Sequence, residues 1–168
     1  MPCTASVMGN LYWQARLLEP PYGPRDPAQQ TLEAKTGLGM PRRWESPHGV
    51  SRGDAIGVIW PRTTVDQSGR PHAVVVEGPM DALAAAGCGY IGIALLSATP
   101  SEECLHLTAK LLHGIMTLAV MDIGAEDAMI FNAGWLRERG VPCRLVNPYP
   151  HKDLAACPED QRATLLTQ

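Results

Sequence analysis

Acidic residues stand at the ends of two apolar runs in the second half of this chain. Glu77 directly follows the run Ala73–Val76, and Asp122 directly follows Ile115–Met121. Both runs are typical of strands that are covered on both faces of a parallel sheet. The carboxyl ends of such strands meet at one edge of the sheet, where open α/β sheets bind their ligands. We therefore expect Glu77 and Asp122 to lie at one ligand-binding edge.

The charges of the chain indicate which ligands these carboxylates suit. Residues 1–72 carry eight Lys/Arg and six Asp/Glu, whereas residues 73–168 carry six Lys/Arg and eleven Asp/Glu. A basic segment joined to an acidic one can bind a polyanion on one side and divalent cations on the other. So small a difference is equally typical of a solvated surface. On charge alone, cation binding and a solvated acidic surface are equally supported.

A helix is expected directly after the strand that ends before Glu77. Gly78 permits a tight turn, and the fixed φ of Pro79 suits the first turn of a helix. That helix contains Asp81 in its first turn and ends at Gly87.

The same alternation of strand and helix continues downstream. Thr99 as N-cap, Pro100 and Glu102 form a capping-box pattern that predicts a helix running to about His113. The further elements expected are strands at Tyr90–Leu96, Ile115–Met121 and Val141–Val146 and a helix that follows Gly124 and ends at Gly140. This order predicts an α/β fold with a parallel sheet and helices on both faces.

Residues 1–71 show a different sequence pattern. Period-two alternation in LYWQARLLEP predicts a strand, Glu19–Arg43 is rich in proline and glycine, and Ala55–Trp60 predicts a second strand. We expect two domains: a small basic α+β lobe at 1–71 and an α/β domain at 72–168.

Composition limits the setting of the protein. At 168 residues and 45% apolar content, the chain can bury one core and a small extra lobe. Its five cysteines form no C-x-x-C pair, which indicates neither a zinc knuckle nor a disulfide framework. No signal-peptide pattern or long apolar run is present, so we expect a cytoplasmic protein, in a bacterial or infected host cell, without membrane contact.

Three short motifs resemble the Toprim domain of bacterial-type primases, topoisomerases and some nucleases. They are Glu77-Gly78-Pro79-Met80-Asp81, then Asp122-Ile123-Gly124, then Lys152-Asp153. The resemblance covers about residues 72–157 and implies a Toprim-type sheet. Upstream, YWQARLLEP and PRRWESPHGVSRGDAIGVIWP resemble the segment that precedes Toprim in bacterial and phage primases. This second resemblance favours a DNA primase.

The resemblance implies Mg²⁺ or Mn²⁺ as cofactor and a role for each carboxylate. Asp122 and Asp153 would be metal ligands, Glu77 a general base or a further ligand, and Asp81 a catalytic residue that holds a metal-bound water or orients a neighbour. Toprim domains usually carry D-x-D where this chain has Asp122-Ile123-Gly124. Losing a carboxylate weakens a divalent site unless another carboxylate reaches in. Glu126 or Asp127 could replace the missing group, and Glu126 is the favoured candidate because Asp127 more often only decorates the first turn of a helix.

The resemblance also implies contacts with nucleic acid. The basic residues expected to bind template or nucleotide phosphates are Arg16, Arg42, Arg43, Arg52 and Lys152. The partners would be a single-stranded DNA template, nucleoside triphosphates, and separate chains that supply zinc-binding and helicase modules.

Three functions follow from these features. The first is a minimal or split primase core, from a phage or mobile element, that makes RNA primers by nucleotidyl transfer. The second is a Toprim nuclease that cleaves phosphodiesters with the same carboxylates. The third is a catalytically weakened replication accessory that binds nucleic acid.

Overall fold

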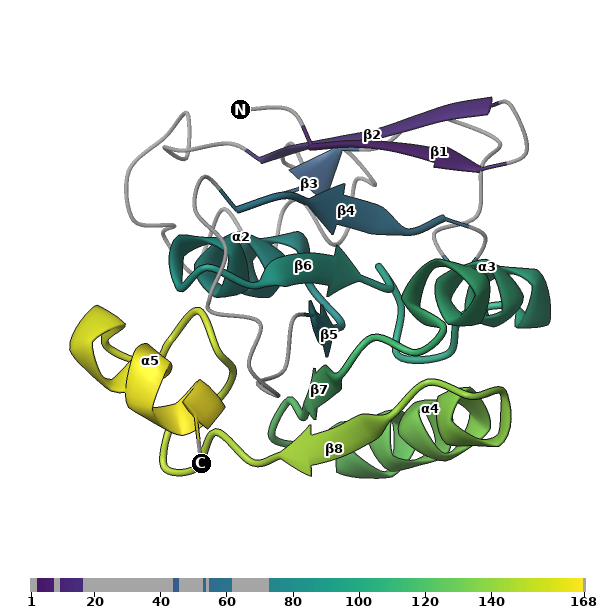
Figure 1. Ribbon diagram of the computed structural model, residues 1–168. Coiled ribbons are helices and arrows are strands. Elements are labelled where there is room, and N and C mark those ends of the chain that lie inside the picture. Colours follow the sequence, from purple (N-terminus) through teal and green to yellow (C-terminus); the bar gives the residue numbers. More distant parts are fainter. Residues whose placement is uncertain are drawn as a thin grey trace, which may run out of the picture.

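The computed structural model describes residues 3–7, 10–16, 44–45, 53, 55–61 and 73–167. Its strands are β1 (Cys3–Val7), β2 (Asn10–Arg16), β3 (Trp44–Glu45), β4 (Gly57–Ile59), β5 (Ala73–Val76), β6 (Ile91–Ala94), β7 (Thr117–Val120) and β8 (Cys143–Val146). Its helices are α2 (Pro79–Gly87), α3 (Glu102–Leu112), α4 (Glu126–Glu138) and α5 (Glu159–Thr167). The strands form two sheets, ordered β1-β2-β3 and β4-β6-β5-β7-β8. Figure 1 shows the smaller sheet beside β4.

The five-stranded sheet carries the fold. Strand β5 pairs in parallel with both β6 and β7, and β7 pairs in parallel with β8. The predicted α/β fold is therefore confirmed. The sheet is not wholly parallel, however, because β4 pairs with β6 in the antiparallel direction. An antiparallel edge strand is common on an otherwise parallel sheet.

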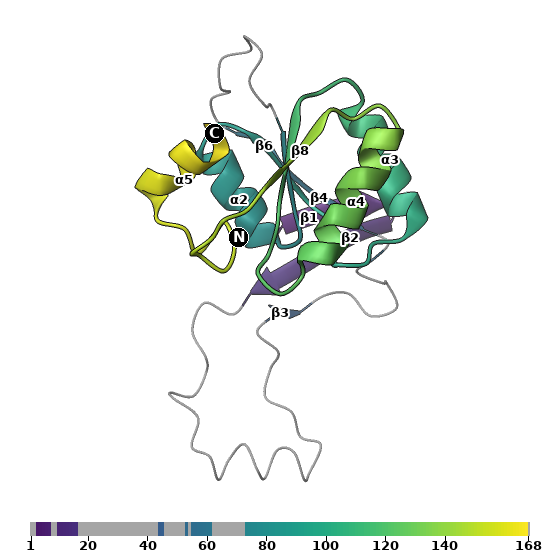
Figure 2. The ribbon, with the colours of Figure 1, turned by 90° about the horizontal axis from the view of Figure 1, so that it is seen from below.

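Two apolar cores cover the two faces of this sheet. On one face, the alternate residues Val74, Val76 and Leu118 pack with α2 and with Leu166 of α5. On the other face, Val75 and Ala119 pack with residues of α3 and α4. Figure 2 shows the sheet between these two helix pairs. Strand β5 is covered on both faces, and this explains why all four of its residues are apolar and buried.

Helix α2 lies directly on β6. A Cβ atom placed on Gly92 would collide with the Ala82 carbonyl oxygen, so only glycine fits at this point of the strand. The helix begins at Pro79, with Gly78 as its N-cap, as the sequence predicts.

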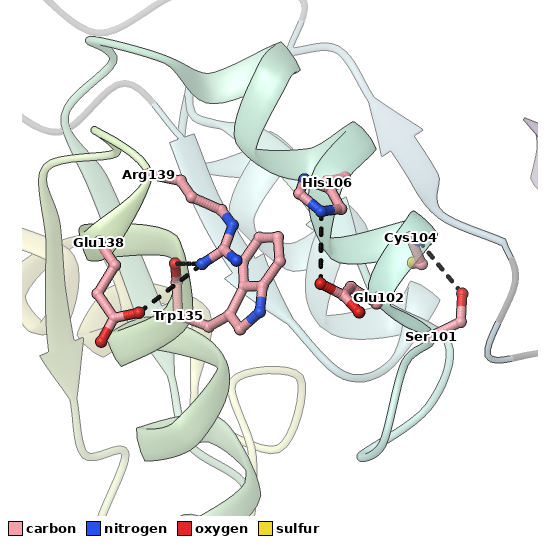
Figure 3. Close-up of polar contacts among 7 residues, drawn as sticks. All are labelled: Ser101, Glu102, Cys104, His106, Trp135, Glu138 and Arg139. Atoms are coloured by element: carbon pink, nitrogen blue, oxygen red, sulfur yellow. Dashed lines mark hydrogen bonds and ion pairs between the residues drawn. The ribbon is translucent and has the colours of Figure 1, made fainter.

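Helix α3 starts later than its sequence pattern predicts. The N-cap is Ser101 rather than Thr99, and the Ser101 Oγ accepts a hydrogen bond of 3.2 Å from the Cys104 N–H (Figure 3). The Thr99 N–H instead donates to the Ser97 Oγ, at 3.1 Å. Serine is preferred over threonine as an N-cap, which is consistent with the cap at Ser101. Helix α5 was not predicted at all.

Helices α3 and α4 meet through an aromatic cluster on the outer side of the sheet (Figure 3). The Arg139 guanidinium lies 3.4 Å from the centre of the Trp135 ring. The His106 ring contacts Trp135 edge-on, with ring centres 4.8 Å apart, and its Nε2 lies 3.5 Å from the Glu102 carboxylate.

No helix in the described residues is long and apolar enough to span a membrane.

Candidate functional site at the carboxyl edge of the sheet

A small pocket lies where β5, β6 and β7 end. Glu77 directly follows β5, and Asp122 follows β7 after one intervening residue. Both side chains line the pocket, together with Ser97 from the segment after β6 and Asn132 from α4. The pocket measures about 10 Å³, which is close to the space that one water molecule requires. The structure thus brings the two carboxylates to one site, at the edge where ligands bind in such folds.

The position of Glu77 is fixed through its backbone. The Leu96 N–H donates to the Glu77 carbonyl at 2.9 Å, and the Leu95 N–H donates to Val76 at 2.9 Å. Leu96 has a φ of 61°, a left-handed conformation that is unfavourable for leucine. Such strain persists only where the surrounding structure imposes it. Here it accompanies the turn that places Ser97 in the wall of the pocket.

Asp122 holds its proton unusually tightly. Burial is the main cause that raises the pKa of its carboxyl to about 7. Repulsion raises this pKa further and comes from the carboxylates of Asp81, Glu77 and Asp153, whereas the Lys152 ammonium lowers it. Three acidic side chains, from two other parts of the sequence, therefore act on Asp122 at this edge.

Asp81 is buried at the start of α2. Its Oδ1 accepts a hydrogen bond of 2.8 Å from the Ala155 N–H. Burial, and then the charges of Asp153 and Glu77, raise the pKa of Asp81, although the bond from Ala155 lowers it. A Cβ on Gly78 would lie 2.7 Å from Asp81 Oδ2, so glycine at that position leaves room for the carboxylate.

The segment with Lys152 and Asp153 is joined to the turn after β7. The Ile123 N–H donates to the Lys152 carbonyl at 2.8 Å. The Asp153 Oδ1 accepts a bond of 2.7 Å from the Ala156 N–H, while the Lys152 side chain is exposed. Together with the bond from Ala155 to Asp81, these contacts hold Asp153 near the pocket.

The turn after Asp122 explains why a second aspartate is absent. Gly124 has a φ of 94°, a conformation that favours glycine over aspartate. Its N–H donates to Glu126 Oε2 at 2.9 Å, and this bond lowers the pKa of the Glu126 carboxyl. Glu126 thus closes the turn at the start of α4, and its contact is with the backbone of the turn.

Four of the expected phosphate-binding residues have no described side chain. Arg42, Arg43 and Arg52 lie outside the described residues, and Arg16 is described only as the last residue of β2. Lys152 is the expected phosphate-binding residue whose side chain the structure places, near the carboxylates.

Sequence reasoning missed Ser97 and Asn132. Asn132 carries a signal in hindsight, because it is a polar residue in the buried stripe of α4 that also contains Met129, Ala133 and Leu136. Ser97 carries no comparable signal, since serine is ordinary in a loop after a strand.

The acidic side chains at this edge carry hard oxygen donors, the ligand type that divalent cations bind. A cation would relieve the repulsion that raises the pKa of Asp122. In the part of the chain that the structure describes, no three His, Cys, Asp or Glu side chains are grouped closely enough to hold a metal ion. Mg²⁺ often binds through one or two carboxylates together with waters and substrate phosphates.

Comparisons with protein-family models, with curated proteins and with solved structures find no match for this chain. Its function is therefore inferred from the residues of the site.

Proposed function

We propose that this chain is the catalytic core of a DNA primase-like nucleotidyltransferase, built on a Toprim domain, which makes RNA primers on single-stranded DNA. The observation that supports the proposal is that Glu77 and Asp122 line one pocket at the carboxyl edge of the sheet. Burial, and then repulsion from Asp81, Glu77 and Asp153, raises the pKa of Asp122 there. Acidic groups that repel each other at the ligand-binding edge of an α/β sheet are typical of cation-dependent sites.

In this reaction a primer 3′-hydroxyl attacks the α-phosphorus of a nucleoside triphosphate, and pyrophosphate leaves. A bound Mg²⁺ or Mn²⁺ would supply charge neutralisation and would align the attacking and leaving oxygens. Asp122 and Asp153 would hold the cation, and Glu77 would take the proton of the hydroxyl or serve as a further ligand. Asp81 would keep Asp153 in place through Ala155.

The nucleic acid would lie across this edge of the sheet. The exposed Lys152 ammonium, beside Asp153, would contact a phosphate of the triphosphate or of the template. Arg16, Arg42, Arg43 and Arg52 would bind the template backbone. The protein would act in the cytoplasm of a bacterial or infected host cell, as a minimal or split phage or mobile-element primase with zinc-binding and helicase modules on other chains.

The test is incorporation of labelled ribonucleotides on single-stranded DNA, with Mg²⁺ or Mn²⁺ and with candidate partner chains added. The wild type should synthesise primers of two or more nucleotides. Glu77→Gln and Asp122→Asn should abolish this synthesis. Asp127→Asn is the matched control, because Asp127 is exposed in the first turn of α4 and should leave activity unchanged. Divalent-dependent cleavage of DNA without triphosphates would instead identify a nuclease.

One observation favours a second candidate, a replication accessory that binds nucleic acid without turnover. Gly124 lacks the carboxylate of the D-x-D pattern, and Glu126 already bonds to the backbone of the turn. Binding of single-stranded DNA that is unaffected by Glu77→Gln and Asp122→Asn, with no synthesis or cleavage, would support this candidate.

A further inference from the structure

A segment of turns and bends carries part of the candidate site. It covers residues 147–158, between β8 and α5, and it contains Lys152 and Asp153. Backbone groups in such a segment lack the ladder of hydrogen bonds that fixes a strand or a helix, so other contacts must hold them in place. Figure 2 shows α5, which follows the segment, beside α2 on one side of the sheet.

Arg162 supplies two of these contacts from the first turn of α5. Its Nε donates a hydrogen bond of 3.1 Å to the Leu154 carbonyl, and its Nη2 donates one of 2.8 Å to the Ala155 carbonyl. The guanidinium is a rigid planar fork whose nitrogens can bind two acceptors at once. Hydrogen bonds from an ionised donor are about twice as strong as those between neutral groups. The side chain thus holds the carbonyls of two consecutive residues.

Ala155 joins this contact to the acidic edge of the sheet. Its N–H donates to Asp81 Oδ1 at 2.8 Å, while its carbonyl accepts the bond from Arg162. Asp153 lies two residues before Ala155 in the same segment. A change in the position of Ala155 would therefore move Asp153 and break the bond that ties the segment to α2.

Arg162 reaches the acidic residues through the backbone and not through its charge. The cation that lowers the pKa of Asp122 is Lys152, and the charges that act on the pKa of Asp81 are those of carboxylates. Within the described part of the chain, no carboxylate forms an ion pair with Arg162. Its two bonds to carbonyls are therefore the contacts that connect it to the site.

We propose that Arg162 is a positioning residue: its guanidinium holds the Leu154 and Ala155 carbonyls, so that the segment keeps the Ala155 N–H on Asp81 and presents Asp153 at the carboxyl edge of the sheet. This gives α5 a role at a site whose pocket it does not line. The effect on catalysis rests on the proposed function, whereas the effect on the segment can be measured without it.

The test is amide hydrogen exchange of the full chain, followed by NMR, in the wild type, Arg162→Gln and Arg162→Lys. Loss of the fork should release the segment, so the Ala155 amide should exchange at least about 10-fold faster in Arg162→Gln, while the amides of β7 keep their wild-type rates. A lysine ammonium does not match the fork on two carbonyls, so Arg162→Lys should give an intermediate rate. Arg144→Gln is the matched control, because Arg144 is exposed on β8 and its side chain makes none of the described hydrogen bonds.

The chemical shift of the Ala155 amide proton reports its bond to Asp81 directly. Asp81→Ala removes the acceptor and provides the reference value for the unbonded amide. In Arg162→Gln the shift should move toward that reference. If Arg162 only attached α5 to the core, the amides of α5 would change and the Ala155 amide would keep its wild-type shift.

Three results would overturn the inference. The first is an Ala155 amide that exchanges and resonates as in the wild type when Arg162 is replaced by glutamine. The second is an equal loss of protection at Ala155 and throughout β7, which would mean that Arg162 only stabilises the whole fold. The third is wild-type behaviour of Arg162→Lys, which would mean that charge suffices and the contact with two carbonyls is unnecessary.

Primer synthesis by the same variants separates this inference from the proposed function. If the wild type makes primers, Arg162→Gln should make them at least about 10-fold more slowly and Arg144→Gln at the wild-type rate. Synthesis at the wild-type rate by an Arg162→Gln chain whose Ala155 amide is released would show that Arg162 does not position the site. If the wild type makes no primers but Arg162→Gln releases Ala155, the proposed function is wrong and the hold of Arg162 on the segment stands.

Discussion

Asp81 and Ala155 are separated by 74 residues in the sequence and joined by a hydrogen bond of 2.8 Å, from the Ala155 N–H to Asp81 Oδ1. This bond ties the start of α2 to the segment that carries Asp153. The bond accounts for the burial of Asp81, because its carboxylate is the hydrogen-bond acceptor for the Ala155 N–H.

Variants at Asp81 should separate its hydrogen bond from its charge. Asp81→Ala leaves the Ala155 N–H without its acceptor and should lower the free energy of unfolding by about 1–3 kcal/mol. Asp81→Asn keeps an acceptor and removes the repulsion from Glu77 and Asp153, so it should be neutral or stabilising at neutral pH. Urea unfolding at pH 7 measures both. A loss as large in Asp81→Asn as in Asp81→Ala would contradict this account.

The raised pKa of Asp122 predicts how stability depends on pH. Between the ordinary aspartate pKa of 3.8 and about 7, the folded chain keeps a proton that the unfolded chain releases. The folded state binds more protons there, so stability should fall as pH rises through this window. The loss should be about 1–2 kcal/mol, because the side chain is only partly buried and solvent screens the shift.

Asp122→Asn provides the comparison for that pH dependence. The variant cannot ionise, so its urea-unfolding free energy should vary less between pH 4 and pH 7.5 than that of the wild type. An unchanged slope would show that other groups cause the pH dependence.

Two glycine substitutions in the same region should have opposite effects. Gly124 has a φ of 94° and open space around its Cβ position, so Gly124→Ala should cost about 1–2 kcal/mol through backbone strain alone. Gly134 lies inside α4, also with open space, so Gly134→Ala should stabilise by about 0.5–1 kcal/mol. Thermal unfolding of the two variants tests the turn geometry, and equal effects would refute it.

The aromatic cluster between α3 and α4 should contribute to stability. Trp135→Leu removes the ring that contacts both Arg139 and His106, and should destabilise the chain by about 1–3 kcal/mol. Phe131→Leu is the control, because Phe131 is 67% exposed on the same helix and should change stability by less than about 0.5 kcal/mol. Chemical denaturation of the pair decides whether the cluster holds the helices together.

The sequence predicts best where local signals and burial agree. The apolar runs before Glu77 and Asp122 form adjacent parallel strands, and Pro79 begins α2, since these patterns leave few alternatives. Where the sequence allows more than one local structure, tertiary contacts decide between them. The cap at Ser101 and the antiparallel direction of β4 are examples.

The site shows the same division. Placing two carboxylates after parallel strands requires only the topology, so Glu77 and Asp122 could be predicted together. The bond from Asn132 to Ala98 depends on which way a single amide faces in a packed helix, and the contact of Glu126 depends on the turn at Gly124. Neither can be derived from residue types and spacing.

The central claim is that the carboxylates around Asp122 bind a divalent cation, and the most direct measurement is the pKa of the Asp122 side chain with and without Mg²⁺. Carbon-detected NMR of the labelled carboxyl group, assigned with Asp122→Asn, gives this value without partner chains or substrate. The account predicts a pKa of about 7 without the cation and a clear decrease when Mg²⁺ is added, because the cation favours the ionised carboxylate. An ordinary pKa near 3.8, or a raised pKa that Mg²⁺ leaves unchanged, would contradict it.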